Sequence, residues 1–142
     1  MKRPTESIQV RRRMPARREV VYAAWTTPEG FRHWMCPGDI VSAEAELDVR
    51  VGGSFRLVMK SPAEEHVQTG VYQKVEPPAK LVFTWIAGNH PPTRVTVEFN
   101  DLGEESEIVI THEGFIVPDM AKRYQGGWAK IAEKLAAYLT KR

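Results

Sequence analysis

The sequence has 142 residues, a single cysteine, 27% charged residues and a formal net charge of +2 at pH 7. This length suits one domain with an ordinary hydrophobic core, and a single cysteine excludes an intrachain disulfide. No stretch approaches the ~18 uninterrupted apolar residues of a membrane span, and the first ten residues lack the apolar run of a signal peptide. We therefore expect one cytoplasmic domain over residues 1–142, without a membrane span.

Basic residues are concentrated near the N-terminus. Residues 1–18 contain seven Lys or Arg and one Glu, so the remaining chain is mildly acidic. The arginines that cluster there are Arg11, Arg12, Arg13, Arg17 and Arg18. They could contact phosphate, but no nucleic-acid recognition motif or interleaved aromatic pattern accompanies them. A solvated strand end explains them better, and we expect no nucleic-acid partner.

The N-terminal pattern predicts one strand followed by two short helices. Ile8 and Val10 alternate with polar neighbours in a strand that ends near Met14 and Pro15. Residues 16–35 then have helical spacing, which the Thr-Pro step at 27–28 divides into two helices.

Six further strands and one long helix are predicted from residue 40 onward. The strands cover residues 40–49, 54–60, 66–75, 80–87, 94–100 and 107–112, with Gly and Pro residues at the turns between them. Apolar residues spaced by three or four over residues 119–140 predict an amphipathic helix with one broad apolar stripe. The whole pattern indicates an α+β fold in which this helix covers the apolar face of an antiparallel sheet.

One histidine interrupts that apolar face. In the segment IVITHEGF, residues 108–115, His112 falls where strand period calls for an apolar residue. Four roles are open to it: a histidine satisfied by a carbonyl or hydroxyl, a hydrogen-bonding group for a ligand, a general acid–base, or a metal ligand. The other histidines and Cys36 show no close ligand spacing, so we expect no metal. No nucleophile elbow or pair of inward carboxylates indicates a catalytic residue.

Two glycines stand inside the predicted terminal helix. Gly126 and Gly127 each cost about 1 kcal/mol relative to alanine in a helix interior. Close packing against the sheet, or room for a ligand beside the helix, would offset this cost. We favour close packing, because small residues bring backbones together.

The order and spacing of these segments resemble the START-like (SRPBCC) helix-grip superfamily, and within it the family of Hsp90 ATPase activator homologues. The similar segments are VYAAWTTPEGFRHWMCPG, ELDVRVGGSFRLVM, VEPPAKLVFTW, RVTVEF, THEGF and GGWAKIAEKLAAYL. The resemblance covers nearly the whole chain. It implies a curved antiparallel sheet of about six or seven strands wrapped around the C-terminal helix, with an internal cavity. It also implies that Cys36 lies near the cavity mouth, without assigning it a role.

The interior between helix and sheet is therefore the candidate ligand site. Its predicted contacts are mostly aromatic, and they comprise Trp25, Phe31, Trp34, Phe55, Met59, Phe83, Trp85, Val97, Phe99, His112, Phe115, Tyr124 and Trp128. An empty apolar void of ~300 Å³ would forfeit about 7 kcal/mol, so either the rings largely close it or water and an amphipathic ligand occupy it. We expect a small apolar or aromatic ligand, no cofactor and no catalytic residue.

Other functions are alternatives to this binding role. A cyclase- or hydrolase-type enzyme would use the same cavity with His112 as acid–base. The resemblance alone suggests an Hsp90-associated, co-chaperone-like protein, which ranks last because one domain offers no second surface to grip a large client. Four residues predicted on the outer sheet face, Val58, Val82, Ile86 and Val109, form either an apolar patch for a homodimer or isolated surface hydrophobes.

Overall fold

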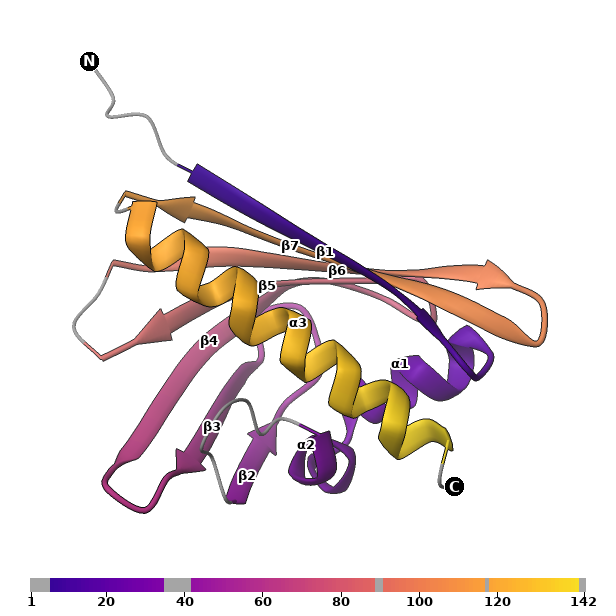
Figure 1. The fold of residues 1–142 in the computed structure, drawn as a ribbon, viewed down its shortest axis with the longest axis horizontal. Coiled ribbons are helices and arrows are strands. Elements are labelled where there is room, and N and C mark those ends of the chain that lie inside the picture. The colour runs from indigo at the N-terminus through magenta and orange to yellow at the C-terminus, as the bar shows by residue number, and fades with distance from the viewer. Residues whose placement is uncertain (1–5, 35–41, 89–90, 117, 141–142) are drawn as a thin grey trace.

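The structure, a computed structural model, describes residues 6–34, 42–88, 91–116 and 118–140 (Figure 1). These ranges contain seven strands and three helices. In chain order they are β1 (Glu6–Met14), α1 (Arg18–Thr26), α2 (Pro28–Trp34), β2 (Ser42–Leu47), β3 (Ser54–Lys60), β4 (Glu65–Glu76), β5 (Lys80–Ala87), β6 (Thr93–Leu102), β7 (Glu105–Phe115) and α3 (Pro118–Thr140). The predicted α+β order, with two short helices after the first strand, is confirmed.

All seven strands form one antiparallel sheet. Its order is β1-β7-β6-β5-β4-β3-β2, so the first strand lies beside the last strand, and β1 and β2 are the edges. Figure 1 shows the sheet curving around α3, which crosses the concave side, while α1 and α2 close one end. This is the predicted helix-grip arrangement.

Local sequence accounts for the two short helices. Thr27 caps α2, because its Oγ1 accepts a hydrogen bond from the backbone N–H of Gly30 at 3.2 Å. Pro28 occupies the first helical position, where its missing N–H costs nothing. The extended backbone of Thr27 (φ −124°, ψ 139°) ends α1 and separates the two helices.

Helix α3 supplies the other half of the core. Its buried residues recur every three or four positions, as its amphipathic pattern predicts. They are Ala121, Trp128, Ile131, Ala132, Leu135, Ala136 and Leu139. The helix packs chiefly against β1, with further contacts to β7 and α2. None of the described helices is long and apolar enough to cross a membrane.

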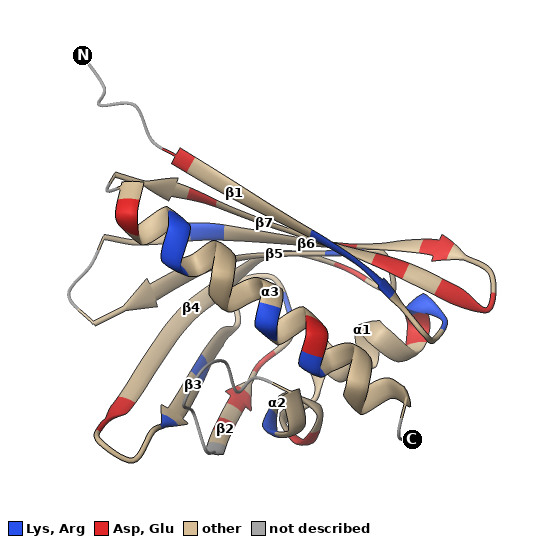
Figure 2. Cartoon of the chain, viewed as in Figure 1, with Lys and Arg blue, Asp and Glu red and all other residues tan. Residues whose placement is uncertain are grey.

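The N-terminal arginines pair with glutamates of the β6–β7 hairpin. Figure 2 shows acidic residues at this hairpin beside the basic end of β1. Arg13 Nε lies 2.6 Å from Glu105 Oε1, and Arg11 Nη1 lies 3.4 Å from Glu107 Oε1. Arg17 forms an ion pair with Glu104. Exposed pairs of this kind contribute about 0–1 kcal/mol each. The charges of these three arginines are nevertheless balanced by glutamates of the same fold.

The outer sheet face is less apolar than predicted. Val58 and Val109 are buried, with 7% and 2% of their surfaces exposed, and Val82 and Ile86 are half-buried. These four residues therefore leave little exposed apolar surface. The homodimer stays a prediction.

Candidate ligand-binding site

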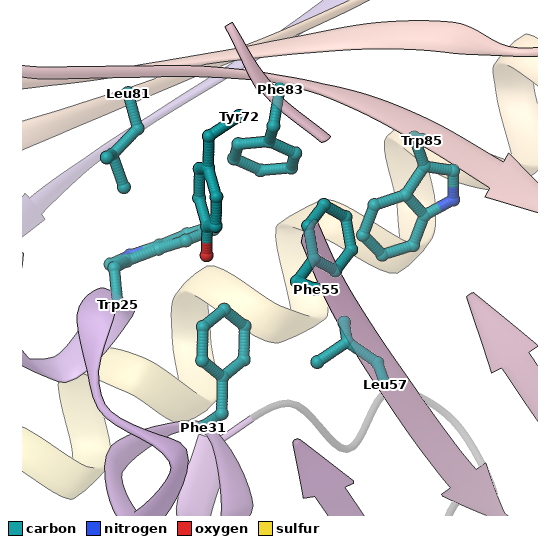
Figure 3. Close-up of a pocket in the computed structure, with 8 residues that line it drawn as sticks. All are labelled: Trp25, Phe31, Phe55, Leu57, Tyr72, Leu81, Phe83 and Trp85. Carbon is teal, nitrogen blue, oxygen red and sulfur yellow. The ribbon is translucent and has the colours of Figure 1, made fainter. Parts of the chain in front are cut away.

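A small aromatic cavity lies between the two short helices and the sheet. Eight residues line it, six of them aromatic: Trp25, Phe31, Phe55, Leu57, Tyr72, Leu81, Phe83 and Trp85. They come from α1, α2, β3, β4 and β5, and Figure 3 shows their side chains converging from these elements. The cavity has a volume of about 10 Å³. That is room for about one water molecule.

Five of the predicted ligand contacts line this cavity, namely Trp25, Phe31, Phe55, Phe83 and Trp85. The others lie around it: Trp34, Met59, Val97, Phe99, His112, Phe115 and Trp128 are buried, and Tyr124 is half-buried. The prediction missed Leu57, Tyr72 and Leu81 as lining residues. Tyr72 faces the cavity because it pairs with the inward-facing Phe83, and the sequence alone does not give this register.

Edge-to-face and stacked rings nearly close the interior. Phe55 meets Phe83 edge-on with ring centroids 5.3 Å apart, and Trp25 stacks on Trp128 at 6.1 Å. These separations are typical of favourable aromatic pairs. The absence of a Cβ at Gly70 makes room for Phe55, because a Cβ there would lie 2.5 Å from the ring. Rings rather than empty space therefore fill most of the predicted cavity.

One tryptophan of this cluster has an unpaired N–H. The chain has four tryptophans, and three indole nitrogens donate hydrogen bonds. Trp34 donates to Ala24 O at 3.1 Å, Trp85 to Tyr124 Oη at 3.1 Å, and Trp128 to His112 Nδ1 at 2.9 Å. Nε1 of Trp25 is buried and has no partner among the described residues. An unsatisfied buried donor costs about 1–3 kcal/mol.

Two buried phenols accompany that N–H. Tyr72 is 3% exposed, and Figure 3 shows its hydroxyl pointing toward the space between Trp25, Phe31 and Phe55. Burial raises the pKa of Tyr72, and the nearby Tyr22 and Asp48 raise it further. Burial also raises the pKa of Tyr22, whose hydroxyl is unpaired within the described chain. Both phenols are therefore neutral and able to donate at pH 7.

His112 lies beside Trp85 and Trp128 in a closed hydrogen-bond chain. Because an indole N–H can only donate, Nδ1 of His112 is the acceptor from Trp128, and the ring proton resides on Nε2. Nε2 lies 2.6 Å from Thr93 Oγ1, and that hydroxyl donates to the carbonyl of Trp85 at 3.1 Å. The His112 side chain is fully buried, and burial lowers its pKa to about 3.

Both ring nitrogens of His112 are therefore engaged within the protein. Of the four roles considered, this geometry favours the first, in which the hydrogen bonds of His112 are made to groups of the protein itself. A neutral imidazole with such a low pKa is protonated too rarely near pH 7 to serve as a general acid.

The two glycines of α3 do not make the predicted close packing. A Cβ built at Gly126 or Gly127 would have no atom of another described part of the chain within 4 Å. The expectation of close helix–sheet contact at these positions is wrong, because Gly126 is exposed, Gly127 is half-buried, and the Cβ position of each opens onto free space.

Two sequence expectations concern metal and thiol chemistry. Cys36, the predicted thiol near the cavity mouth, lies outside the described residues. Within the described ranges, no group of three or more His, Cys, Asp or Glu residues is placed to hold a metal ion.

Comparisons with known proteins agree with this architecture. Residues 15–140 match the sequence family described as activator of Hsp90 ATPase homolog 1-like protein. A Rhodobacter sphaeroides protein superposes with a TM-score of 0.84 at 20% identity, covering 95% of this chain and 92% of its own. A Chromobacterium violaceum protein gives 0.81 at 23% identity, covering 94% and 96%. A Rhizobium loti protein gives 0.78 at 26% identity, also covering 94% and 96%. No curated protein sequence matches the chain.

Proposed function

Because the chain belongs to the activator of Hsp90 ATPase homolog 1-like family, with its helix-grip fold, we propose that it binds a small apolar or aromatic molecule in its interior. The observation that carries this proposal is the cavity bounded by six aromatic side chains. Pockets for small molecules are concave and mostly apolar, with a few placed polar groups. The cavity between α1, α2 and β3–β5 matches this description in the chemistry of its lining, although not in its size.

The ligand must enlarge the cavity, because its volume in the unbound protein is room for about one water molecule. Helix α2 is the element most suited to move, since it has only seven residues and carries Phe31 into the lining. Short helices owe most of their stability to packing. We propose that α2 and the Phe31 ring shift outward when the ligand enters.

Acid–base catalysis gains no support from this site. A catalytic acid or base needs a free nitrogen or oxygen within reach of a substrate, and both nitrogens of His112 already have protein partners. The Hsp90-associated role rests on the family description alone and stays ranked below ligand binding.

Binding of ethylbenzene tests the proposal directly. We expect chemical-shift changes at backbone amides around Phe31, Phe55 and Phe83 when the probe is titrated into the isotope-labelled protein. Leu57→Phe should abolish them, because the larger ring fills the cavity that the buried Leu57 lines. Such overpacking costs about 1–3 kcal/mol, which a native domain tolerates.

Leu102→Phe is the matched control, because Leu102 is 49% exposed and makes no part of the lining. It should bind ethylbenzene as the wild type does. Saturable shifts that persist in Leu57→Phe, or that map only to surface residues, would place the ligand elsewhere.

A further inference from the structure

The indole N–H of Trp25 sets this residue apart from the other tryptophans of the chain. The other three indole N–H groups have acceptors at 2.9–3.1 Å. Trp25 is 1% exposed, is one of the lining residues, and offers a donor that has no acceptor among the described residues. An indole nitrogen cannot accept a hydrogen bond, so only an acceptor can satisfy it. The missing partner is therefore an oxygen or nitrogen with a free lone pair.

Tyr72, another lining residue, supplies a second donor. Its hydroxyl points into the space bounded by Trp25, Phe31 and Phe55 (Figure 3). A carbonyl oxygen has two lone pairs and can accept from both donors at once.

The lining argues against a charged ligand. All eight lining residues are uncharged. The charged side chain that acts electrostatically on Tyr72 is the carboxylate of Asp48, which disfavours a second negative charge nearby. An aromatic cage can hold a cation, but a cation would leave both donors unsatisfied.

We propose that the ligand is a neutral, flat molecule bearing a carbonyl or similar acceptor. The Tyr72 hydroxyl and the Trp25 N–H would donate hydrogen bonds to that acceptor. This inference rests on the proposed function and adds the chemical class of the ligand. The apolar rings supply contact area, and the two donors favour an acceptor-bearing ligand over an apolar ligand of similar shape.

Two neutral probes of nearly the same shape test this selectivity. Acetophenone carries a carbonyl where ethylbenzene carries a methylene. Tyr72→Phe should weaken acetophenone binding about three- to tenfold more than it changes ethylbenzene binding, which is the usual worth of one hydrogen bond. Tyr138→Phe is the matched control, because Tyr138 on α3 stacks on the exposed His33 and makes no part of the lining. It should affect neither probe.

A spectroscopic measurement on the wild-type protein makes the test independent of the variant. The carbonyl stretching band of bound acetophenone should lie at lower frequency than in hexane, as hydrogen bonding requires. Benzoate and trimethylanilinium should bind more weakly than acetophenone.

The outcomes separate the two proposals. If ethylbenzene binds but Tyr72→Phe changes both neutral probes equally or neither of them, the acceptor inference is wrong and the binding function stands. A carbonyl band at its hexane frequency, or preferred binding of either charged probe, also overturns the inference. Failure of the wild-type protein to bind any probe would refute the binding function, and the inference with it.

Discussion

Acid should destabilise this protein through His112. The folded-state pKa is lowered to about 3, whereas an unfolded histidine has a pKa of about 6.5. Between these values the unfolded chain binds one more proton than the folded chain. Stability is therefore complete above about pH 6.5 and is lost as pH falls toward 3, at up to about 1.4 kcal/mol per pH unit.

The effect is best measured above pH 5, where most carboxylates do not yet titrate. Integration from pH 7 to pH 5 gives a loss of about 2 kcal/mol from His112 alone, out of the 5–15 kcal/mol that typical domains possess. His112→Gln is the comparison, because glutamine offers one acceptor and one donor group and does not titrate. The other histidines are common to both proteins and cancel in the difference.

Urea denaturation at pH 7, 6 and 5, at constant ionic strength, measures this effect. The unfolding free energy of the wild type should fall about 2 kcal/mol more than that of His112→Gln over this range. Equal losses in the two proteins would mean that His112 titrates near its ordinary pKa, and the hydrogen-bond chain described above would be wrong.

Three substitutions probe other contacts through thermal unfolding. Thr93→Val removes the acceptor of the His112 N–H and should cost about 1–3 kcal/mol, roughly 4–12 °C in Tm; an unchanged Tm would contradict that bond. Gly127→Ala should stabilise by up to about 1 kcal/mol, because a Cβ there meets no described neighbour and alanine favours the helix. A loss of stability would reveal a contact at this face. Gly70→Ala should destabilise, since its Cβ would lie 2.0 Å from the carbonyl oxygen of Thr84 and would separate β4 from β5. Unaltered amide protection along both strands would count against this.

Residue periodicity was enough to predict the strands, the helices and the covered antiparallel sheet, whereas the helix-grip arrangement followed from the family resemblance. Alternation along β6 and β7 and the three-four spacing of α3 each identify one face, and a sheet with one apolar face needs a cover. The same parity placed His112 inward, where it shares a hydrogen bond with Trp128.

The position of the cavity could not be predicted in this way. Thr93 reaches His112 only because of the β6–β7 register, in which Val95 pairs with His112. Tyr72 was overlooked because the register of β4 against β5 shifts between Tyr72 and Lys74, which breaks a simple count of alternate residues. Open space beside Gly126 and Gly127 depends on the path of the whole helix, which no local pattern encodes.

The pairing of β1 with β7 determines when the nascent protein can finish folding. Gln9 and Thr111 share a hydrogen bond across 102 residues, and α3 packs chiefly on β1. The first strand leaves the ribosome early and must wait for almost the entire chain before either partner exists. Contacts so distant in sequence form slowly, and unpaired strands are prone to aggregate until these contacts form. The three consecutive arginines of β1 give the unpaired strand a positive charge, which disfavours its association with β1 of another copy.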